Sequence, residues 1–254
     1  MKIVAVIPAH LASVRFPRKI LFAFYGLPMI EHVRRRALLS GAVSDVYVAT
    51  CDEEIAKVVR GFGGKVIITA NTHTNGTTRV AEAIKDVDCT HVMLLQGDEP
   101  LLLPRHIDIF AKAISAEPKG DAWNATGPIE HEQELDRHSF VKAAISLSGH
   151  ILYCFRRTPC CSPFSVQKIF IRKVLGIIAY RKDFLLQLMK LPASPIEKAE
   201  FIEQMRIIDN GYSLRSVSVS PSLPSVNEPA EAGLILEYID KNDDQRTLLE
   251  QVLK

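Results

Sequence analysis

The sequence predicts an α/β protein with a mainly parallel central sheet and helices on both of its faces. Three observations lead to this fold class. Short apolar segments rich in β-branched residues alternate with stretches of helical spacing through the first half of the chain. Two of these segments end in polar loops, at 8–19 and 96–100. The length of 254 residues and the 47% hydrophobic content suit one large domain with its own core.

The first half of the chain supplies the alternating elements. The apolar segments at 3–7, 46–50, 66–69 and 91–96 are expected to be strands, and the segments at 28–40, 52–60, 78–85 and 105–116 are expected to be helices. Asp52 is placed to cap the second helix. Parallel sheets bind ligands outside the carboxyl ends of their strands. The polar loops at 8–19 and 96–100 are therefore expected to line one cleft.

The second half of the chain is less regular and predicts a small mixed α/β lobe. Residues 143–147 and 151–154 flank Ser148-Gly149-His150 and are typical of a hairpin. The segment 157–168, with two prolines, is expected to be a loop. The remaining expectations are strands at 176–180 and 214–219 and helices at 182–190, 196–210 and 230–253.

Composition and charge exclude several classes of function. The 31 basic and 29 acidic residues leave a net charge of +2, which gives no reason to expect nucleic acid or a membrane surface as partner. The apolar segment near the start is too short for a membrane span and lacks the features of a signal peptide. The five cysteines have no disulfide or zinc spacing. We therefore expect a cytoplasmic protein with reduced thiols.

Two loops carry groups suited to phosphate chemistry. The loop after the first strand holds His10, Arg15, Arg18 and Lys19, so it either binds a polyphosphate or is a solvated basic loop. The loop is not a P-loop, because the required glycines and the Gly-Lys-Ser/Thr ending are absent. Asp98 follows the fourth predicted strand. It either holds Mg²⁺, which prefers one or two carboxylates plus substrate phosphates, or caps the following turn.

Two further segments have weaker signals. Asn75-Gly76-Thr77-Thr78-Arg79 combines a flexible glycine with hydroxyls and fits either contact with a base or phosphate, or helix capping by Thr77. Glu200, Glu203 and Gln204 share a side of a predicted helix. They either bind sugar hydroxyls or belong to a charged helix face stabilised by neighbouring pairs.

Taken together and in order, the motifs of this chain resemble those of the CMP-Kdo synthetases, which are CTP:3-deoxy-manno-octulosonate (Kdo) cytidylyltransferases. The resemblance spans nearly the whole chain, and Gln96-Gly97-Asp98-Glu99-Pro100 is its most specific element. The other matching segments include Ser13, Arg15, Pro17 and Lys19, Pro28-Met29-Ile30, Phe62-Gly63-Gly64, Val141-Lys142, Glu197-Lys198-Ala199-Glu200, Glu203-Gln204 and Asn210-Gly211-Tyr212.

The resemblance implies a nucleotide-diphospho-sugar transferase-like fold. It implies a single domain over 1–254 with a smaller sugar-binding and dimerisation lobe at about 125–215. The implied reaction transfers CMP from CTP to Kdo, releases pyrophosphate and serves lipopolysaccharide biosynthesis. The implied protein is a cytoplasmic homodimer that requires Mg²⁺.

The resemblance also implies the roles of individual residues. The implied catalytic residues are Arg15, Lys19 and Asp98. The implied metal ligands are Asp98 and Asn227. The implied nucleotide-binding residues are Pro8, Ala9, His10, Ser13, Arg15, Lys19, Asn75, Gly76, Thr77 and Gln96, and the implied sugar-binding residues are Gln96, Tyr180, Glu203 and Gln204.

Five departures from the family pattern fall at these implied contacts. The chain has His10 in place of Arg, Arg18 in place of Gly, Thr78 in place of Asp, Val174 in place of the sugar-site His, and Asn227, followed by Glu228, in place of a metal-binding Asp. Two alternatives therefore accompany the Kdo reaction. One is the same reaction on an amino-Kdo or a nonulosonic acid. The other is a catalytically weak or dead homologue that binds a nucleotide or a partner.

Overall fold

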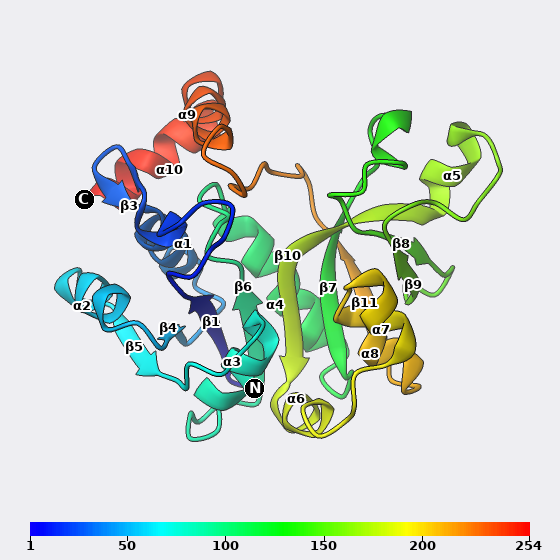
Figure 1. Ribbon diagram of the computed structural model, residues 1–254, viewed down its shortest axis with the longest axis horizontal. Helices are drawn as coiled ribbons and strands as arrows, with labels where there is room; N and C mark the ends of the chain where they lie inside the picture. The colour runs from blue at the N-terminus through cyan, green and yellow to red at the C-terminus, as the bar shows by residue number, and fades with distance from the viewer. The chain divides into compact units, whose positions relative to one another are not determined.

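The computed structural model describes all 254 residues and divides them into two compact units (Figure 1). The first unit contains residues 1–111 and 223–254, and the second contains residues 112–222. The chain thus leaves the first unit once and returns to it for its last two helices. No helix in the structure has the length and apolar character needed to cross a bilayer.

The first unit is built on a parallel sheet, as the sequence predicts. Its strands are β1 (Ile3–Ala9), β4 (Asp45–Thr50), β5 (Lys65–Ile68) and β6 (His91–Leu95), in the spatial order β6-β1-β4-β5. Val4 of β1 lies in register with Asp45 on one side and Val92 on the other. The side chains of β6 are buried along its whole length, which explains why its sequence is a continuous apolar run.

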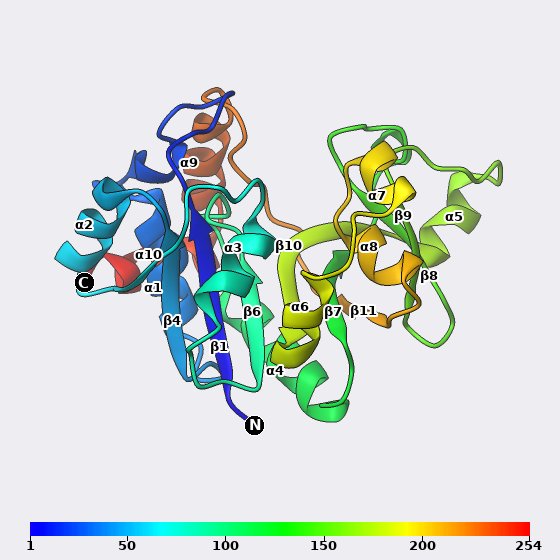
Figure 2. The same ribbon diagram turned by 60° about the horizontal axis from the view of Figure 1, so that its bottom comes forward.

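Helices cover both faces of this sheet. Figure 2 shows α3 (Gly76–Ala83) in front of β1 and β6, with α1 (Met29–Leu38) behind β4. This placement follows from right-handed crossovers, because the chain reverses direction across the sheet between β5 and β6. The other elements of the unit are η1 (Lys19–Leu21), β2 (Ala23–Phe24), β3 (Leu27–Pro28), α2 (Glu53–Gly61), α9 (Glu231–Lys241) and α10 (Asp243–Leu253), and α4 (Pro104–Ala116) runs from the first unit into the second.

Helix α1 carries charged side chains into the interior and ties α10 to the unit. Glu31 is fully buried and accepts two hydrogen bonds from Arg34, at 2.8 and 2.6 Å. Arg36 is also fully buried and donates to the carbonyl oxygen of Leu102 and to the Gln245 side chain on α10. Burial lowers the pKa of Arg36 to about 10.

The second unit is a mixed sheet with short helices. Its strands are β7 (Ala122–Gly127), β8 (Lys142–Ile145), β9 (Ile151–Phe155), β10 (Ile171–Arg181) and β11 (Leu214–Ser218). β7 pairs with β11 in parallel and with β10 in antiparallel orientation, and β10 also pairs with β8. The predicted hairpin is confirmed as β8 and β9. The helices are η2 (Glu132–Glu134), α5 (Phe164–Phe170), α6 (Lys182–Leu188), α7 (Pro195–Glu200) and α8 (Gln204–Asp209).

The single helix predicted over 196–210 is wrong, because the chain forms α7 and α8 with a break at Phe201. The backbone of Phe201 is left-handed, with φ 55°, which ends α7. Arg156 donates hydrogen bonds to the carbonyl oxygens of Glu200 and Phe201, at 2.9 and 3.3 Å. These bonds satisfy acceptors that the helix break leaves without helical partners.

Three other boundaries differ from the sequence-based expectation. The segment 157–168, expected to be a loop, contains the first turn of α5. The strand expected at 176–180 begins earlier, at Ile171, because its first residues pair with β8. Strand β7 was not predicted at all, since Asn124 and Thr126 interrupt its apolar pattern.

Candidate nucleotide-binding site

The first unit contains a cavity of about 540 Å³ at the carboxyl ends of its parallel strands. The segments after β1 and after β6 both line it, which confirms that the loops at 8–19 and 96–100 share one cleft. The lining residues are Pro8, Ala9, His10, Ala12, Ser13, Lys19, Ile20, Cys51, Asp52, Asn71, His73, Thr74, Asn75, Gly76, Arg79, Gln96, Gly97 and Asp98.

Two glycines permit the close packing around this cavity. A Cβ atom at Gly97 would lie 2.5 Å from the Cδ1 atom of Ile20, and a Cβ atom at Gly76 would lie 3.0 Å from Cγ of Pro8. A side chain at Gly97 would therefore displace the side chain of Ile20. The glycines bring the backbone of the β6 turn and of the α3 start against the loop that follows β1.

Lys19 and Asp98 form an ion pair at the cavity. The Lys19 Nζ atom lies 2.7 Å from Oδ2 of Asp98, and the two side chains are 15% and 26% exposed. The pair joins the loop after β1 to the turn after β6. Asp98 thus uses its carboxylate on a cation that lines the same cavity, instead of capping the turn.

The region around α2 fixes the basic loop at two points. The backbone N–H of Leu11 donates to Oδ2 of Asp52 at 2.9 Å, so this carboxylate anchors the loop and makes no side-chain cap to α2, contrary to the sequence-based expectation. Arg18 forms an ion pair with Glu54 on α2. Its backbone is left-handed, with φ 60°, which is the conformation that glycine adopts most readily. The Arg18 cation therefore points to α2, and Arg18 is not among the lining residues.

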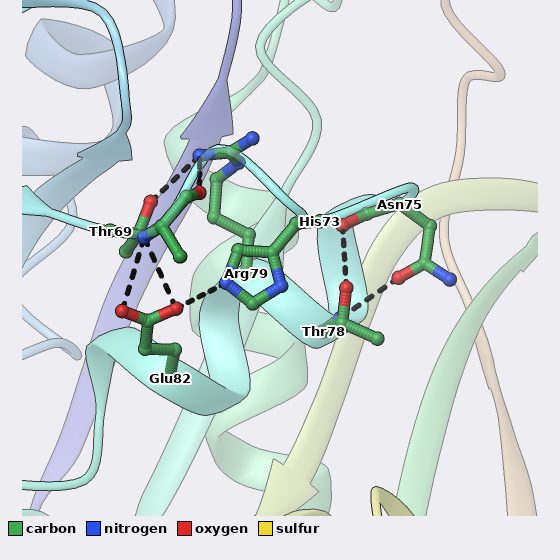
Figure 3. Close-up of polar contacts among 7 residues, drawn as sticks. Thr69, His73, Asn75, Thr78, Arg79 and Glu82 are labelled. Atoms are coloured by element: carbon green, nitrogen blue, oxygen red, sulfur yellow. Dashed lines mark hydrogen bonds and ion pairs between the residues drawn. The ribbon is translucent and has the colours of Figure 1, made fainter.

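The start of α3 brings a second group of polar side chains to the cavity (Figure 3). Asn75 caps the helix, because its Oδ1 atom accepts the N–H of Thr78 at 2.9 Å. The alternative in which Thr77 caps the helix is therefore wrong, and Thr77 is buried. The Thr78 hydroxyl donates to the carbonyl oxygen of Asn75, which is a local bond within the turn.

Arg79 and His73 are held in place by partners on neighbouring segments (Figure 3). Arg79 is 4% exposed and donates to the Thr69 hydroxyl at 2.7 Å and to the Ala70 carbonyl oxygen at 3.4 Å. His73 Nε2 is hydrogen-bonded to the Glu82 carboxylate. This hydrogen bond is the largest cause that lowers the pKa of Glu82 below its ordinary value. The cavity wall is thus rigidly hydrogen-bonded on this side.

Sequence-based reasoning missed part of the cavity lining. The unexpected lining residues with polar side chains or thiols are Cys51, Asp52, Asn71, His73 and Thr74. Cys51 and Asp52 follow β4, which is a direct neighbour of β1. The signal that could have found them is their position directly after a predicted parallel strand. Arg15, in contrast, is exposed on the basic loop and is not among the lining residues.

Asp98 and Asn227 lie on segments that are joined by a backbone hydrogen bond. The N–H of Val226, next to Asn227, donates to the carbonyl oxygen of Asp98 at 2.9 Å. Oδ2 of Asp98 accepts from Lys19, and the Nδ2 group of Asn227 donates to the Ser225 hydroxyl. One carboxylate and one amide oxygen form a donor set that fits Mg²⁺ when substrate phosphates supply further oxygens. No cluster of three or more His, Cys, Asp or Glu side chains offers an alternative.

The sequence-predicted sugar-binding residues divide between the two units. Gln96 is exposed and lines the cavity of the first unit. In the second unit, Tyr180 is 2% exposed on β10, Glu203 is half-buried at the start of α8, and Gln204 donates to Asn124. Nearby, Arg206 makes two hydrogen bonds to Glu197, at 2.8 and 2.6 Å. Glu197 therefore stabilises the α7–α8 pair and is not free for a ligand.

The parallel sheet, the basic loop at the end of β1 and the ion pair at the cavity together define a nucleotide-binding α/β protein. Comparison with known proteins identifies the particular family. Residues 4–216 match the family described as Cytidylyltransferase. The chain belongs to this cytidylyltransferase family.

Similar proteins include cytidylyltransferases that act on Kdo. The chain is 35% identical to the 3-deoxy-manno-octulosonate cytidylyltransferase of Geobacter metallireducens over 252 residues, which cover 95% of this chain and 99% of that protein. It is 37% identical to an enzyme of the same name from Escherichia coli, covering 90% and 92% of the two chains. A solved CMP:2-keto-3-deoxy-manno-octonic acid synthetase in complex with CTP superposes with a TM-score of 0.89 at 35% identity, covering 95% of this chain and 99% of that one.

Proposed function

We propose that this cytidylyltransferase transfers CMP from CTP to Kdo, an acidic sugar, and releases pyrophosphate. The observation that carries the proposal is the Lys19–Asp98 pair in the strand-end cavity. It combines a phosphate-binding cation and a metal-binding carboxylate in a chain whose relatives bear the name of this reaction. In the proposed step the sugar's anomeric hydroxyl attacks the α-phosphorus of CTP, an O–P bond forms, and the bond to the leaving pyrophosphate breaks.

The cavity supports binding of the nucleotide. Lys19 neutralises the triphosphate, and the exposed Arg15 on the same loop supplies a second cation. The other proposed nucleotide contacts are Pro8, Ala9, His10, Ser13, Asn75, Gly76, Thr77 and Gln96, and all of these except the buried Thr77 line the cavity. Reactions of this type depend mainly on positioning and charge neutralisation, so no side-chain nucleophile is required.

We propose Mg²⁺ as the cofactor, held by Asp98 and Asn227. When bound, the ion would neutralise part of the triphosphate charge. Asp98 would bring the only charge of this pair, because Asn227 would hold the ion through a neutral amide oxygen. Lys19 donates to the same Asp98 carboxylate and so holds it at the cavity. The proposed sugar contacts are Gln96, Tyr180, Glu203 and Gln204.

The test is a measurement of pyrophosphate release from CTP in the presence of Kdo and Mg²⁺, with parallel detection of the CMP-sugar. Reactions without sugar and without Mg²⁺ serve as controls. We expect release that depends on both. Release without formation of a CMP-sugar would show CTP hydrolysis instead. No release by folded protein that binds CTP in a calorimetric titration would contradict the proposal.

Val174 favours a second candidate, the same reaction on an amino-Kdo or a nonulosonic acid. Val174 occupies the position where the family pattern has its sugar-site histidine, and its side chain offers no hydrogen bond. A panel of acidic sugars, compared by kcat/KM, separates the candidates. Kdo as the best acceptor would exclude this alternative.

Asn227 favours a third candidate, a weak or inactive homologue that binds a nucleotide or a partner. The amide cannot supply the charge that an aspartate would bring to a metal. The Asn227→Asp variant is the direct probe. A large gain in kcat would show that metal binding is weakened in this chain, whereas an unchanged or lower kcat would show a site adapted to Asn227.

We also propose that the protein acts as a cytoplasmic homodimer in lipopolysaccharide biosynthesis. The support is the resemblance of its motifs and the names of its relatives. Sedimentation equilibrium of the purified chain tests the dimer. A single species of the monomer mass, 28.3 kDa, at assay concentrations would exclude it.

A further inference from the structure

Asn124 is a fully buried polar residue in the middle of β7. Its Nδ2 group donates to the carbonyl oxygens of Leu175 at 3.0 Å, Ile177 at 3.3 Å and Ala125 at 3.0 Å. Leu175 and Ile177 lie on β10 where its pairing with β7 shifts register between Val174 and Ile178. An asparagine in a central strand is unfavourable unless its polar groups have partners. The irregular stretch of β10 supplies them.

The direction of these hydrogen bonds fixes the orientation of a second side chain. Carbonyl oxygens are acceptors only, so the Asn124 amide must direct its NH₂ group to β10. Its Oδ1 atom, on the other side, can then only accept a hydrogen bond. Gln204 lies there, with Nε2 3.0 Å from this oxygen. Gln204 must therefore direct its NH₂ group to Asn124.

The consequence is that Gln204 presents its carbonyl oxygen away from Asn124. Gln204 begins α8, directly after Glu203, and its side chain is only half-buried. If the NH₂ group of Gln204 were free to turn outward, the residue could offer a donor or an acceptor to a ligand. The bond to Asn124 turns the NH₂ group inward and uses one of its two N–H donors, so the group that Gln204 directs away from Asn124 is the acceptor oxygen.

We propose that Asn124 is a positioning residue that fixes Gln204 as a hydrogen-bond acceptor for a hydroxyl or amino group of the acceptor sugar. This inference rests on the proposed function, in which Gln204 contacts the sugar. Asn124 itself does not touch the sugar. The simpler interpretation is that Asn124 serves only to satisfy the irregular stretch of β10. The two interpretations differ in whether Asn124 influences the KM for the sugar through the orientation of Gln204.

The Asn124→Asp variant distinguishes them by its pH dependence. A protonated aspartic acid has the shape of asparagine, donates to a carbonyl oxygen and accepts from Gln204. Burial beside carbonyl oxygens raises the pKa of an aspartate at this position. The residues opposite position 124 on its neighbouring strands, Ile178 and Ser216, are not titratable. The ionised carboxylate still accepts from Gln204 but repels the carbonyl oxygens of β10. If Asn124 acts through Gln204, the KM for the sugar therefore stays near that of the wild type at every pH, whereas an effect through β10 raises KM as the carboxyl group ionises.

The measurement is pyrophosphate release by the full-length chain, with KM determined for Kdo and for CTP from about pH 6 to about pH 9, a range in which a buried carboxyl group with a raised pKa titrates. We expect the ratio of Asn124→Asp to wild-type KM for Kdo to stay near one across this range, with KM for CTP unchanged, and a rise in this ratio with pH would overturn the inference. Asn124→Ser, whose shorter side chain moves the acceptor away from Gln204, should instead raise KM for Kdo about tenfold, the factor for a lost hydrogen bond of about 1.4 kcal/mol. Asn210→Asp is the matched control, since Asn210 is an exposed amide at the end of α8. It should leave both KM values unchanged.

A double-mutant cycle keeps the inference testable if Asn124→Asp folds poorly. It compares Asn124→Ser, Gln204→Met and the double variant in KM for Kdo. If Asn124 acts through Gln204, the double variant will have the KM of Gln204→Met alone. If the two substitutions change KM for Kdo independently, so that the factors of the single variants multiply in the double variant, the inference is overturned. An unchanged KM for Kdo in all Asn124 variants of an otherwise active enzyme would also overturn it. No sugar-dependent release by the wild type would instead remove the proposed function on which the inference rests.

Discussion

Asp98 is the residue on which the proposed chemistry depends most. We expect Asp98→Asn to lower kcat/KM by about 100-fold or more, because it removes the only charge among the proposed metal ligands. The free energy of unfolding should change by about 1 kcal/mol or less, since the Lys19–Asp98 pair is partly exposed. Steady-state kinetics provides kcat/KM, and thermal unfolding provides the change in stability. Asp88→Asn, which removes the exposed Lys2–Asp88 pair, is the matched control and should leave kcat/KM unchanged.

His32 should make the stability of the first unit depend on pH. It is buried against the carbonyl oxygen of Phe24, 2.8 Å from Nε2, and burial lowers its pKa from 6.5 to about 4. The unfolded chain therefore binds one more proton between these two values. The contribution of neutral His32 to the free energy of unfolding is complete above pH 6.5. It is lost as the pH falls towards 4, by up to about 1.4 kcal/mol per pH unit. Urea unfolding at several pH values should show a smaller acid loss in His32→Gln. If the free energy of unfolding depends on pH in the same way in the wild type and in His32→Gln, this expectation is wrong.

Single residues of the site were predictable where a residue type follows a strand. Asp98 and Lys19 were found because each follows a buried parallel strand. Their ion pair was not predictable, since 79 positions separate them and only the fold brings them together. The direction of the Arg18 side chain was also hidden, because the sequence shows a cation but not the left-handed backbone that turns it towards Glu54.

Helix α3 connects stability and ligand binding within one element. Asn75 caps the helix and also lines the cavity. We expect Asn75→Ala to cost about 1 kcal/mol of stability, because the N–H of Thr78 loses its acceptor, and to raise KM for CTP. Asn75→Ser keeps a capping hydroxyl and should retain most of the stability. Chemical denaturation and CTP kinetics provide the comparison. An equal loss of stability in both variants would show that the cap is not the cause.

At the scale of elements, the sequence predicted the first unit well and the second unit poorly. The parallel strands of the first unit are continuous apolar runs, which are a strong local signal. Strand β7 gave no such signal, because the partners of Asn124 lie about 50 and 80 positions away in sequence. The break between α7 and α8 depends on Arg156, which lies about 45 positions away in sequence from its partners Glu200 and Phe201. Local patterns cannot report contacts of this kind.

At the scale of the whole molecule, the division into two units predicts that each unit contacts a different substrate. All residues that line the nucleotide cavity belong to the first unit, whereas Tyr180, Glu203 and Gln204 belong to the second. Binding lowers the exchange of backbone amides in the segments that it orders. We therefore expect CTP alone to protect 8–19, 71–79 and 96–98 in hydrogen-exchange mass spectrometry.

The second substrate should extend this protection to the other unit. Addition of the CMP-sugar product in place of CTP should protect 174–180 and 203–206 as well, because the proposed sugar contacts lie there. Asn124→Ser is the informative variant for this experiment. It should keep the protection by CTP and lose part of the additional protection, since it disturbs Gln204 without touching the cavity of the first unit. Equal protection of both units by CTP alone would show that the second unit responds to binding of the nucleotide and not of the sugar.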